Sequence, residues 1–333
     1  MRARIRFIAP LVAAVALTAA CGDSGSSGTG GGSESSGNAS GDTCAPVPGD
    51  KLVVLEDDKH LQNADNVIPA VNAQFSQSQP ALLPALNAVS AKLTTEDLVD
   101  MNAAVDVDRK SAEDVAAAWV EQSGVTDGLE KGSGPVAVGG AGFTESTVLA
   151  NVYADVLRAA GFDASVREVG SRELYLKALE GGTEIQAFPE YLATATEFLD
   201  ADEAKQVASG DVDATLAALQ PLAQAAGLAF GEPSEAVDQN AFAVTTAFAE
   251  KVGVKTLSEL ADACSDGSLV LGGPAECPER PFCQPGLEDT YGLKFASFQE
   301  YGDTGGPLTK AAIQKGEVSI GLVFSSDGAL AQG

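Results

Sequence analysis

The fold is decided by the stretch Lys51-Leu52-Val53-Val54-Leu55-Glu56-Asp57-Asp58, an apolar run of strand length that leads into an acidic loop. The end of the chain has the same pattern of a strand and a polar turn, in Val318-Ser319-Ile320-Gly321-Leu322-Val323-Phe324-Ser325-Ser326-Asp327-Gly328. If the C-terminus is connected to Lys51, the order becomes strand, Ser-Ser-Asp-Gly turn, strand. We expect this order where a chain crosses between two lobes.

Predicted strands and helices alternate between these two ends. The run Pro135–Gly140 is a buried strand that enters a glycine turn, and a helix follows from Phe143 to Ala160. This alternation favours an α/β fold with a largely parallel sheet. The folded part, roughly 49–333, is too long for one small core and fits two lobes. The other predicted strands are Ala164–Val169, Glu184–Phe188, Ala241–Val244 and Ser268–Leu271, and the other helices are Glu173–Leu179, Tyr191–Leu199, Thr256–Ala263 and Pro307–Lys315.

The segment before Pro135 has a mainly helical pattern. Leucines and valines recur at helical spacing in Pro80–Leu93, and Thr94 with Asp97 has the pattern of a capping box that opens a further helix. Residues 127–134 are rich in Gly, Lys and acids and are predicted to be a linker.

The N-terminus has the pattern of an export signal. Residues 1–20 combine three arginines with a short apolar run, which is too short for a stable membrane span. Leu17-Thr18-Ala19-Ala20-Cys21 resembles a bacterial lipobox, and the resemblance implies that Cys21 carries a lipid. The alternative is an ordinary secreted protein with an unmodified Cys21. The following residues, to about 49, are mostly Gly, Ser, Thr and Asn and are expected to form a flexible tether.

Four further cysteines favour disulfides, because an even number in an exported protein is more typical of disulfides than of a metal site. Cys277 and Cys283 are six residues apart and suit a small closed loop. Cys44 and Cys264 then remain as a pair by elimination. The chain has no Cys-x-x-Cys pair, so we expect no metal site.

The formal net charge of −27 excludes nucleic acid as a partner, since phosphate binding needs a basic surface. An acidic chain is compatible with attracting a small cation, although the simplest role for this charge is solubility. The single histidine, His60, leaves little support for a catalytic triad. Motifs for dinucleotides, nucleotide phosphates and EF-hand calcium are also missing from the sequence. We therefore expect neither an enzyme nor a cofactor.

Candidate ligand-binding residues follow the predicted strands, because open α/β sheets bind ligands at the carboxyl ends of their strands. Phe143-Thr144-Glu145 and Pro189-Glu190-Tyr191 both lie at such positions. Glu276 and Arg280 form a third candidate beside the small cysteine loop. Arg280 can clamp a carboxylate by paired hydrogen bonds. Its alternative role is a structural ion pair with Glu276 or Glu279.

Several separate motifs resemble the osmoprotectant-binding proteins of bacterial ABC importers, which take up glycine betaine, choline or carnitine. The matching stretches are Gly139–Ser146, Phe188–Thr194, Glu276–Pro281 with Tyr291-Gly292-Leu293, and Gly305–Leu308 with Phe324–Gly328. The closing part of that family is present in front, as Leu52–His60, Val67–Asn72 and Ala91–Asn102. The resemblance therefore covers nearly all of 51–333 as a circular permutation, with 126–134 as the new bridge.

That resemblance implies a type II periplasmic-binding-protein fold, α/β and two-lobed, with a hinge and a cleft between the lobes. The implied divisions are 50–126 as the permuted C-terminal part of lobe 1, 127–134 as linker, 135–238 as the main part of lobe 1, 239–322 as lobe 2, and 323–333 as the hinge return to lobe 1. The implied partners are a small osmolyte and the permease of an ABC importer, for a monomer held by lipid on the outer face of the cell membrane.

The resemblance also implies roles for individual residues. Tyr191 matches a cage tyrosine, Thr194 a polar neighbour, Arg280 a carboxylate anchor, and Asp238 and Phe324 further residues of the cage region. The sequence departs from the family pattern at three places: Asn240 stands where a cage tyrosine is common, Ala141 where lysine is common, and Thr309 where an aromatic residue can stand. A polyol or a sugar-derived compatible solute is therefore an alternative ligand. A sensing or adhesion lipoprotein, and a secreted hydrolase that depends on His60, are the alternative functions.

Overall fold

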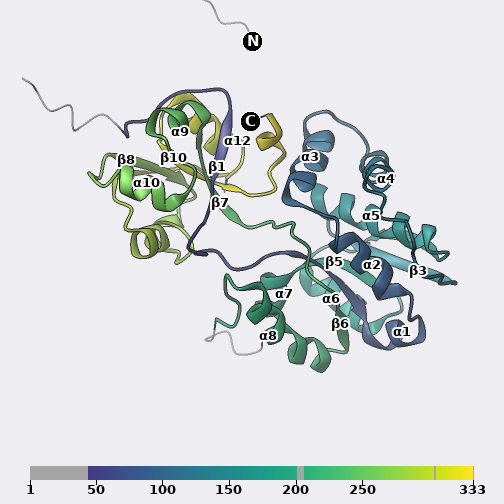
Figure 1. Cartoon of the computed structure of the whole chain (residues 1–333). Coiled ribbons are helices and arrows are strands. Elements are labelled where there is room, and N and C mark those ends of the chain that lie inside the picture. Colours follow the sequence, from purple (N-terminus) through teal and green to yellow (C-terminus); the bar gives the residue numbers. More distant parts are fainter. Residues whose placement is uncertain (1–43, 201–205, 304, 333) are drawn as a thin grey trace, which may run out of the picture. The chain divides into compact units, whose positions relative to one another are not determined.

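The computed structural model describes residues 44–200, 206–303 and 305–332 (Figure 1). The predicted signal segment, Cys21 and most of the predicted tether lie outside these residues. None of the helices within the described ranges combines the length and the apolar character that are needed to cross a bilayer. The described residues form two five-stranded sheets, called sheet I and sheet II below.

Sheet I is mixed and has the strand order β1-β7-β10-β8-β9. Strand β7 runs antiparallel to both β1 and β10, so that Leu52 lies opposite Thr245 and Phe324 lies opposite Asn240. Strand β8 pairs in parallel with β10 on one side and with β9 on the other. The strands span Leu52–Leu55 (β1), Asn240–Thr245 (β7), Leu269–Gly273 (β8), Phe295–Glu300 (β9) and Ile320–Phe324 (β10).

Sheet II is also mixed and has the order β4-β3-β5-β2-β6. Strand β3 pairs in parallel with β4 and β5, whereas β2 runs antiparallel to β5 and β6. Within sheet II, the expected parallel pairing is therefore limited to β3, β4 and β5, because β2 enters from the front segment in the opposite direction. The strands span Val67–Asn72 (β2), Pro135–Gly140 (β3), Asp163–Glu168 (β4), Ala187–Tyr191 (β5) and Leu228–Phe230 (β6).

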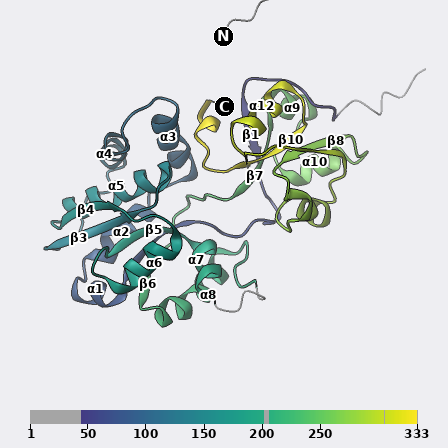
Figure 2. The same cartoon turned by 180° about the vertical axis from the view of Figure 1, so that it is seen from behind.

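Both faces of each sheet carry a buried apolar core, since successive side chains of a strand point to opposite faces. Val136 and Val138 belong to the core under α2 to α5, and Ala137 to the core under α6 to α8 (Figures 1 and 2). In sheet I, Phe242 packs with α9 and α10, whereas Ala243 packs with α12. The helices span Ala73–Ser78 (α1), Leu82–Ser90 (α2), Thr95–Asp106 (α3), Ala112–Ser123 (α4), Thr144–Ala159 (α5), Arg172–Gly181 (α6), Leu192–Leu199 (α7), Val212–Ala225 (α8), Thr246–Val252 (α9), Leu257–Ala263 (α10), Gln284–Gly286 (α11) and Pro307–Lys315 (α12), with short turns at Cys277–Glu279 (η1), Leu287–Tyr291 (η2) and Gly328–Gln332 (η3).

Three segments, 56–66, 231–239 and 325–327, lead from elements of one sheet to elements packed on the other, and we call them the hinge segments. They are hydrogen-bonded side by side: the Asp238 amide donates to the Asp65 carbonyl at 3.2 Å, and the Ser325 amide donates to the Gln239 carbonyl at 2.9 Å. The third segment ends at Gly328, where a Cβ atom would lie 2.5 Å from the backbone nitrogen of Ala103. The Ser-Ser-Asp-Gly turn therefore needs its glycine for a close approach to α3.

The lobe boundary at residue 50 and the bounds of β5 differ from the sequence-based expectation. Strand β1 lies in sheet I, so the range 50–126, expected to belong to lobe 1 alone, contributes a strand to each sheet. Its Leu52 and Leu55 are buried in cores of sheet I, which explains the pairing with β7. Strand β5 also begins later than expected and includes Pro189, which lies opposite Pro69 of β2. Two facing prolines are tolerated at a position where neither residue has to donate to the other.

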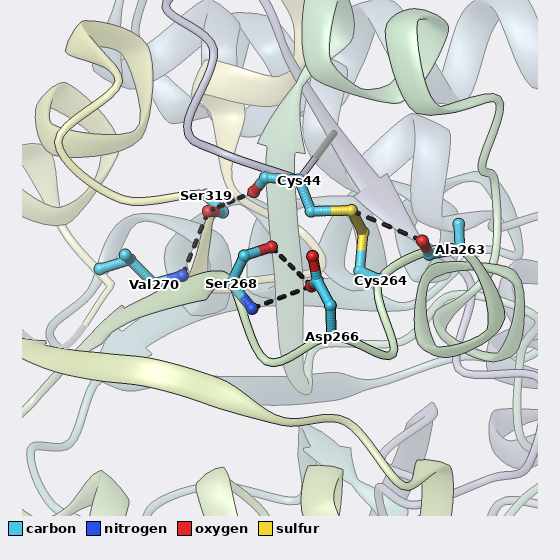
Figure 3. Close-up of a disulfide and its surroundings, with 7 residues drawn as sticks. All are labelled: Cys44, Ala263, Cys264, Asp266, Ser268, Val270 and Ser319. Atoms are coloured by element: carbon cyan, nitrogen blue, oxygen red, sulfur yellow. Dashed lines mark hydrogen bonds between the residues drawn. A yellow bond between two sulfur atoms is a disulfide. The ribbon is translucent and has the colours of Figure 1, made fainter. Parts of the chain in front are cut away.

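Both expected disulfides are present, Cys44–Cys264 and Cys277–Cys283. Figure 3 shows Cys44 joined to Cys264 and to the Ser319 hydroxyl, which donates to the Cys44 carbonyl at 3.1 Å. The same hydroxyl accepts a hydrogen bond from the Val270 amide at 3.1 Å. The start of the described chain is therefore linked covalently to the end of α10 and by a hydrogen bond to the residue that precedes β10.

Candidate functional site

Glu145 is a buried carboxylate of the candidate site. It lies in the first turn of α5, directly after strand β3 and its glycine turn, and is 5% exposed. The Tyr191 hydroxyl donates to Glu145 Oε1 at 2.6 Å, and Asn102 Nδ2 donates to Oε2 at 2.7 Å. Burial raises the pKa of Glu145, and these two hydrogen bonds partly offset that effect by favouring the charged form.

Asp238 is a second carboxylate of the site, is half-buried, and belongs to a hinge segment. The Ser326 hydroxyl donates to Asp238 Oδ1 at 2.9 Å. Burial and the neighbouring charge of Glu145 raise the pKa of Asp238 to about 7. The same Ser326 accepts from Asn102 Nδ2 through its carbonyl at 2.9 Å. Glu145 and Asp238 are therefore joined through the two residues Asn102 and Ser326.

Asp65 is a third carboxylate, on the hinge segment beside Asp238. The Thr194 amide donates to Asp65 Oδ1 at 2.9 Å, and the Thr194 hydroxyl donates to Oδ2. Burial raises the pKa of Asp65 to about 6, although both bonds from Thr194 act in the opposite direction. Because Thr194 lies in the first turn of α7, this pair fixes the hinge segment to that helix.

These carboxylates line two clefts that meet at Asp238 and Phe324. The larger, the Glu145 cleft, has a volume of about 630 Å³, and the smaller, the Thr194 cleft, of about 340 Å³. The Glu145 cleft is lined by Asn102, Asp106, Val107, Arg109, Phe143, Thr144, Glu145, Asp238, Pro307, Lys310, Phe324, Ser326, Asp327, Gly328 and Ala329. The Thr194 cleft is lined by Gln62, Asn63, Asp65, Ala193, Thr194, Glu197, Asp238, Gln239, Asn240, Phe282 and Phe324.

Two phenylalanines stand out in the Glu145 cleft because their rings are exposed. Phe143 is 47% exposed and Phe324 is 38% exposed, whereas most large apolar side chains of the described residues are buried. Phe143 precedes the first turn of α5, and Phe324 ends strand β10. Exposed aromatic rings beside buried carboxylates can attract a cation through both the ring faces and the negative charge.

Seven of the predicted ligand-binding residues line these clefts, and an eighth, Tyr191, contacts one of the lining residues. Tyr191 is 6% exposed and lines neither cleft, but it holds Glu145 through its hydroxyl. The seven lining residues are Phe143, Thr144, Glu145, Thr194, Asp238, Asn240 and Phe324.

Glu190 has no exposed surface and is bonded entirely within the protein. Arg172 Nε lies 3.2 Å from Glu190 Oε1, and the Tyr175 hydroxyl donates to the same oxygen at 2.7 Å. The Tyr191 amide and Arg172 Nη2 donate to Oε2 at 2.9 and 3.3 Å. Four donors and complete burial leave no atom of this carboxylate accessible to a ligand in this structure.

Glu276 and Arg280 lie outside both clefts and form an ion pair of 3.1 Å with each other. Their side chains are 42% and 61% exposed, so the pair contributes little to stability. This geometry is the structural alternative for Arg280. Its predicted role as a carboxylate anchor stays a prediction.

The other lining residues of the two clefts are not sequence-based candidates for ligand binding, and three of them are informative. Asn102 comes from α3, Asp65 from a hinge segment, and Phe282 from the small disulfide loop. Asp65 stands among polar residues in the sequence, and Asn102 is one polar residue of a helix that alternates polar and apolar residues, so no local pattern distinguishes them. Phe282 gives a usable signal, since an apolar residue inside a closed cysteine loop needs a surface to cover.

The fold and site define a class: a solute-binding protein in which adjacent hinge segments join two α/β lobes beside clefts lined by carboxylates and aromatic rings. The chain belongs to the family described as the substrate binding domain of ABC-type glycine betaine transport systems, whose profile matches residues 45–122 and 134–332. The expected two-lobed fold and membership of this family are confirmed. Members of this family bind small solutes outside the cytoplasm and interact with a membrane permease, and they are not enzymes.

Two solved structures are similar to the chain. Apo YehZ from Escherichia coli is 23% identical with a TM-score of 0.49, and the alignment covers 60% of this chain and 72% of that chain. A crystal structure of a glycine betaine/carnitine/choline ABC transporter is 18% identical with a TM-score of 0.45, covering 60% of this chain and 70% of that chain. No curated protein matches the chain.

Proposed function

We propose that this protein is the receptor of an ABC importer and binds a small quaternary-ammonium osmolyte, such as glycine betaine, choline or carnitine, in the Glu145 cleft. The observation that carries the proposal is the exposure of Phe143 and Phe324 in the same cleft as the buried Glu145 and the half-buried Asp238. A quaternary ammonium cannot donate a hydrogen bond, so ring faces and negative charge are the groups that recognise it. Each ring contributes roughly 0.5–2 kcal/mol, depending on how far water is excluded.

A zwitterionic osmolyte also needs a positive group for its carboxylate. Arg109 and Lys310 line the same cleft, and Lys310 is paired with Asp327 at 2.5 Å. Arg109 is therefore the cation of this cleft that forms no ion pair among the described residues, and we propose it as the carboxylate anchor beside the predicted anchor Arg280. Closure of the lobes around the ligand brings anchors from different elements together.

A polyol or sugar-derived solute is the second candidate ligand. It is favoured by the Thr194 cleft, whose amide side chains Gln62, Asn63, Gln239 and Asn240 suit hydroxyl groups better than a trimethylammonium group. A sensing or adhesion role is the alternative to transport, and no cleft or contact of the described residues specifically favours it.

We also propose that the protein acts as a monomer, is anchored by a lipid on Cys21 and is a circular permutation of its family. The permutation is supported by the two separate family matches, whose gap at 123–133 overlaps the expected bridge. It is further supported by the proximity of the chain's ends, since Leu330 packs in the apolar cluster that contains Leu52.

A thermal-shift screen tests the function and separates the two ligand classes. Glycine betaine, choline and carnitine are expected to raise the melting temperature, because a ligand at one hundred times its Kd stabilises the folded state by about 2.7 kcal/mol. Sorbitol and trehalose serve as the polyol and sugar probes. A shift with these two compounds alone would transfer the proposal to the second candidate, and no shift with any compound would reject both.

A further inference from the structure

Two carboxylates of the Glu145 cleft, Glu145 and Asp238, are held together without a basic partner. Asp238 accepts from the Ser326 hydroxyl, and Glu145 accepts from Tyr191 and Asn102, so all of their donors are neutral groups. Among the ion pairs of the described residues, none involves Glu145 or Asp238. A buried and a half-buried carboxylate that share neighbours and lack a cation cannot both be ionised without an electrostatic cost.

The surroundings of Asp238 add further negative charge. Asp65 lies on the adjacent hinge segment, where its carbonyl accepts from the Asp238 amide at 3.2 Å. Asp327 follows on the third hinge segment and is balanced by Lys310 of α12. The remaining charged or titratable groups that face the cluster or share its clefts are Tyr191 of β5, Glu190 with Arg172 of α6, Asp106 and Arg109 at the end of α3, and Glu197 of α7.

An unpartnered acceptor at the same place points to a missing group. Asn102 is 6% exposed and lines the Glu145 cleft, and its Nδ2 donates to both Glu145 and Ser326. Its Oδ1 is buried and accepts no hydrogen bond from any described residue. A buried acceptor without a donor is costly, so a positive or hydrogen-bond-donating group that enters the cleft beside Asn102 would be stabilised there.

We propose that capture of a cationic ligand is coupled to release of a proton from the Glu145–Asp238 pair. The coupling rests on the proposed function, since it requires a positively charged ligand in the Glu145 cleft. In the empty cleft the pair shares one proton, which relieves the repulsion between the two carboxylates. An ammonium group replaces that proton as the source of positive charge, and the proton leaves to solvent while both carboxylates remain ionised.

The direction of the pH dependence follows from linkage. The pKa of Asp238 is raised to about 7 in the empty cleft, and a bound cation favours the ionised form and lowers this pKa. The ligand therefore binds more tightly to the deprotonated pair, and affinity falls as the pH drops below about 7. If the pKa in the complex lies below 5, the Kd of a cation is about tenfold higher at pH 6 than at pH 8.

Calorimetric titration of choline measures the coupling directly. At pH 7, titrations in phosphate and in Tris, which differ in ionisation heat, are expected to show release of about half a proton per bound choline. The matched probe is 3,3-dimethylbutan-1-ol, a neutral molecule of nearly the same shape in which carbon replaces the nitrogen. It is expected to release no proton, and any binding of it is expected to lack the tenfold loss of affinity at pH 6.

Two variants assign the proton, and a third is the control. Asp238→Asn is expected to bind choline more weakly at pH 8 and to remove most of the difference between pH 6 and pH 8. Glu145→Gln is expected to have the same effect, because the proton belongs to the pair. It replaces Asp238→Asn in the test if that variant folds poorly. Asp262→Asn makes the same change of charge at an exposed residue of α10, outside both clefts, and should keep the wild-type pH dependence.

The failures of the two proposals are distinguishable. Binding of choline with one affinity from pH 6 to pH 8 and without proton release would overturn the coupling and leave the proposed function intact. Equal proton release by choline and by its neutral isostere would also overturn the coupling, because charge would then not be the cause. No binding of any ammonium compound at any pH would overturn both.

Discussion

At the scale of single residues, the site depends on how the protein holds Glu145. The motif Phe143-Thr144-Glu145 predicts that this carboxylate begins a helix after a strand, and the structure has it there. The sequence does not predict the hydrogen bond from Asn102, which comes from a segment far away in the chain. Local patterns can therefore predict which residues end a strand, but they cannot predict which distant polar residue will complete the hydrogen bonds of a buried charge.

Tyr191→Phe is expected to weaken ligand binding through Glu145. The change removes the hydroxyl that donates to Glu145 Oε1 at 2.6 Å, and this bond favours the ionised carboxylate that attracts a cation. Hydrogen bonds to charged groups contribute about 1.5–3 kcal/mol, which corresponds to an increase of roughly tenfold or more in the Kd of choline at pH 7. Calorimetric titration measures this increase in the Kd.

Tyr175→Phe is the matched control for that prediction. It removes a similar bond from a tyrosine hydroxyl to a buried carboxylate, Glu190, away from both clefts. We expect a lower free energy of unfolding with a nearly unchanged Kd. Equal losses of affinity in both variants would mean that Tyr191 acts through general stability.

At the scale of elements, agreement is good where one sequence pattern determines the structure. The helix Pro307–Lys315 has the predicted bounds, because a proline opens it and Gly316 with a φ of 71° ends it. Strand β5 is different, since Pro189 indicates the end of a strand when the sequence is considered alone. Its neighbour β2 carries Pro69 at the opposite position, and this compensation depends on the pairing of two segments that are distant in the sequence.

The disulfide between Cys44 and Cys264 is expected to contribute more to the free energy of unfolding than the disulfide between Cys277 and Cys283. It joins residues separated by 220 positions, whereas Cys277 and Cys283 are separated by 6. In the chain-entropy account, the longer loop contributes about 5 kcal/mol and the shorter about 2 kcal/mol to the free energy of unfolding.

Urea denaturation of two double variants tests this difference. Cys44→Ser with Cys264→Ser should lower the free energy of unfolding by more than Cys277→Ser with Cys283→Ser. The reverse order would show that local strain or contacts in the small loop matter more than the restriction of the unfolded chain.

At the scale of the whole molecule, the placement of β1 in sheet I is the feature that the sequence alone does not predict. The two-lobed fold and the two disulfide pairs agree with the sequence-based expectation, and seven of the eleven predicted ligand-binding residues line the clefts. The lobe boundary expected at residue 50 does not agree with the structure, because β1 and β2 are consecutive in the sequence but lie in different sheets. An apolar strand can pair with either sheet, and only the tertiary core decides which.

A reordered chain tests the proposed permutation. It consists of residues 133–332, a short Gly/Ser linker and residues 44–126, so that both disulfides and all strands are kept. We expect it to fold with a melting temperature within a few degrees of the parent and with the same Kd for choline, since permutation is tolerated when the joined ends are close. A permutant opened between Ala243 and Val244 of β7 is the negative control and should not fold. If the first chain aggregates as readily as this control, the ends are not equivalent to a family connection.

The central claim is that aromatic rings and carboxylates of the Glu145 cleft bind a quaternary ammonium group. Its most direct measurement is calorimetric titration of glycine betaine, choline and carnitine into the wild type and two variants at pH 8. The double variant Phe143→Ala with Phe324→Ala is expected to lose roughly 1–4 kcal/mol of binding free energy for the tightest of these ligands. Phe198→Ala removes an equally exposed ring outside both clefts and should bind as the wild type does. Unchanged binding by the double variant would contradict the account.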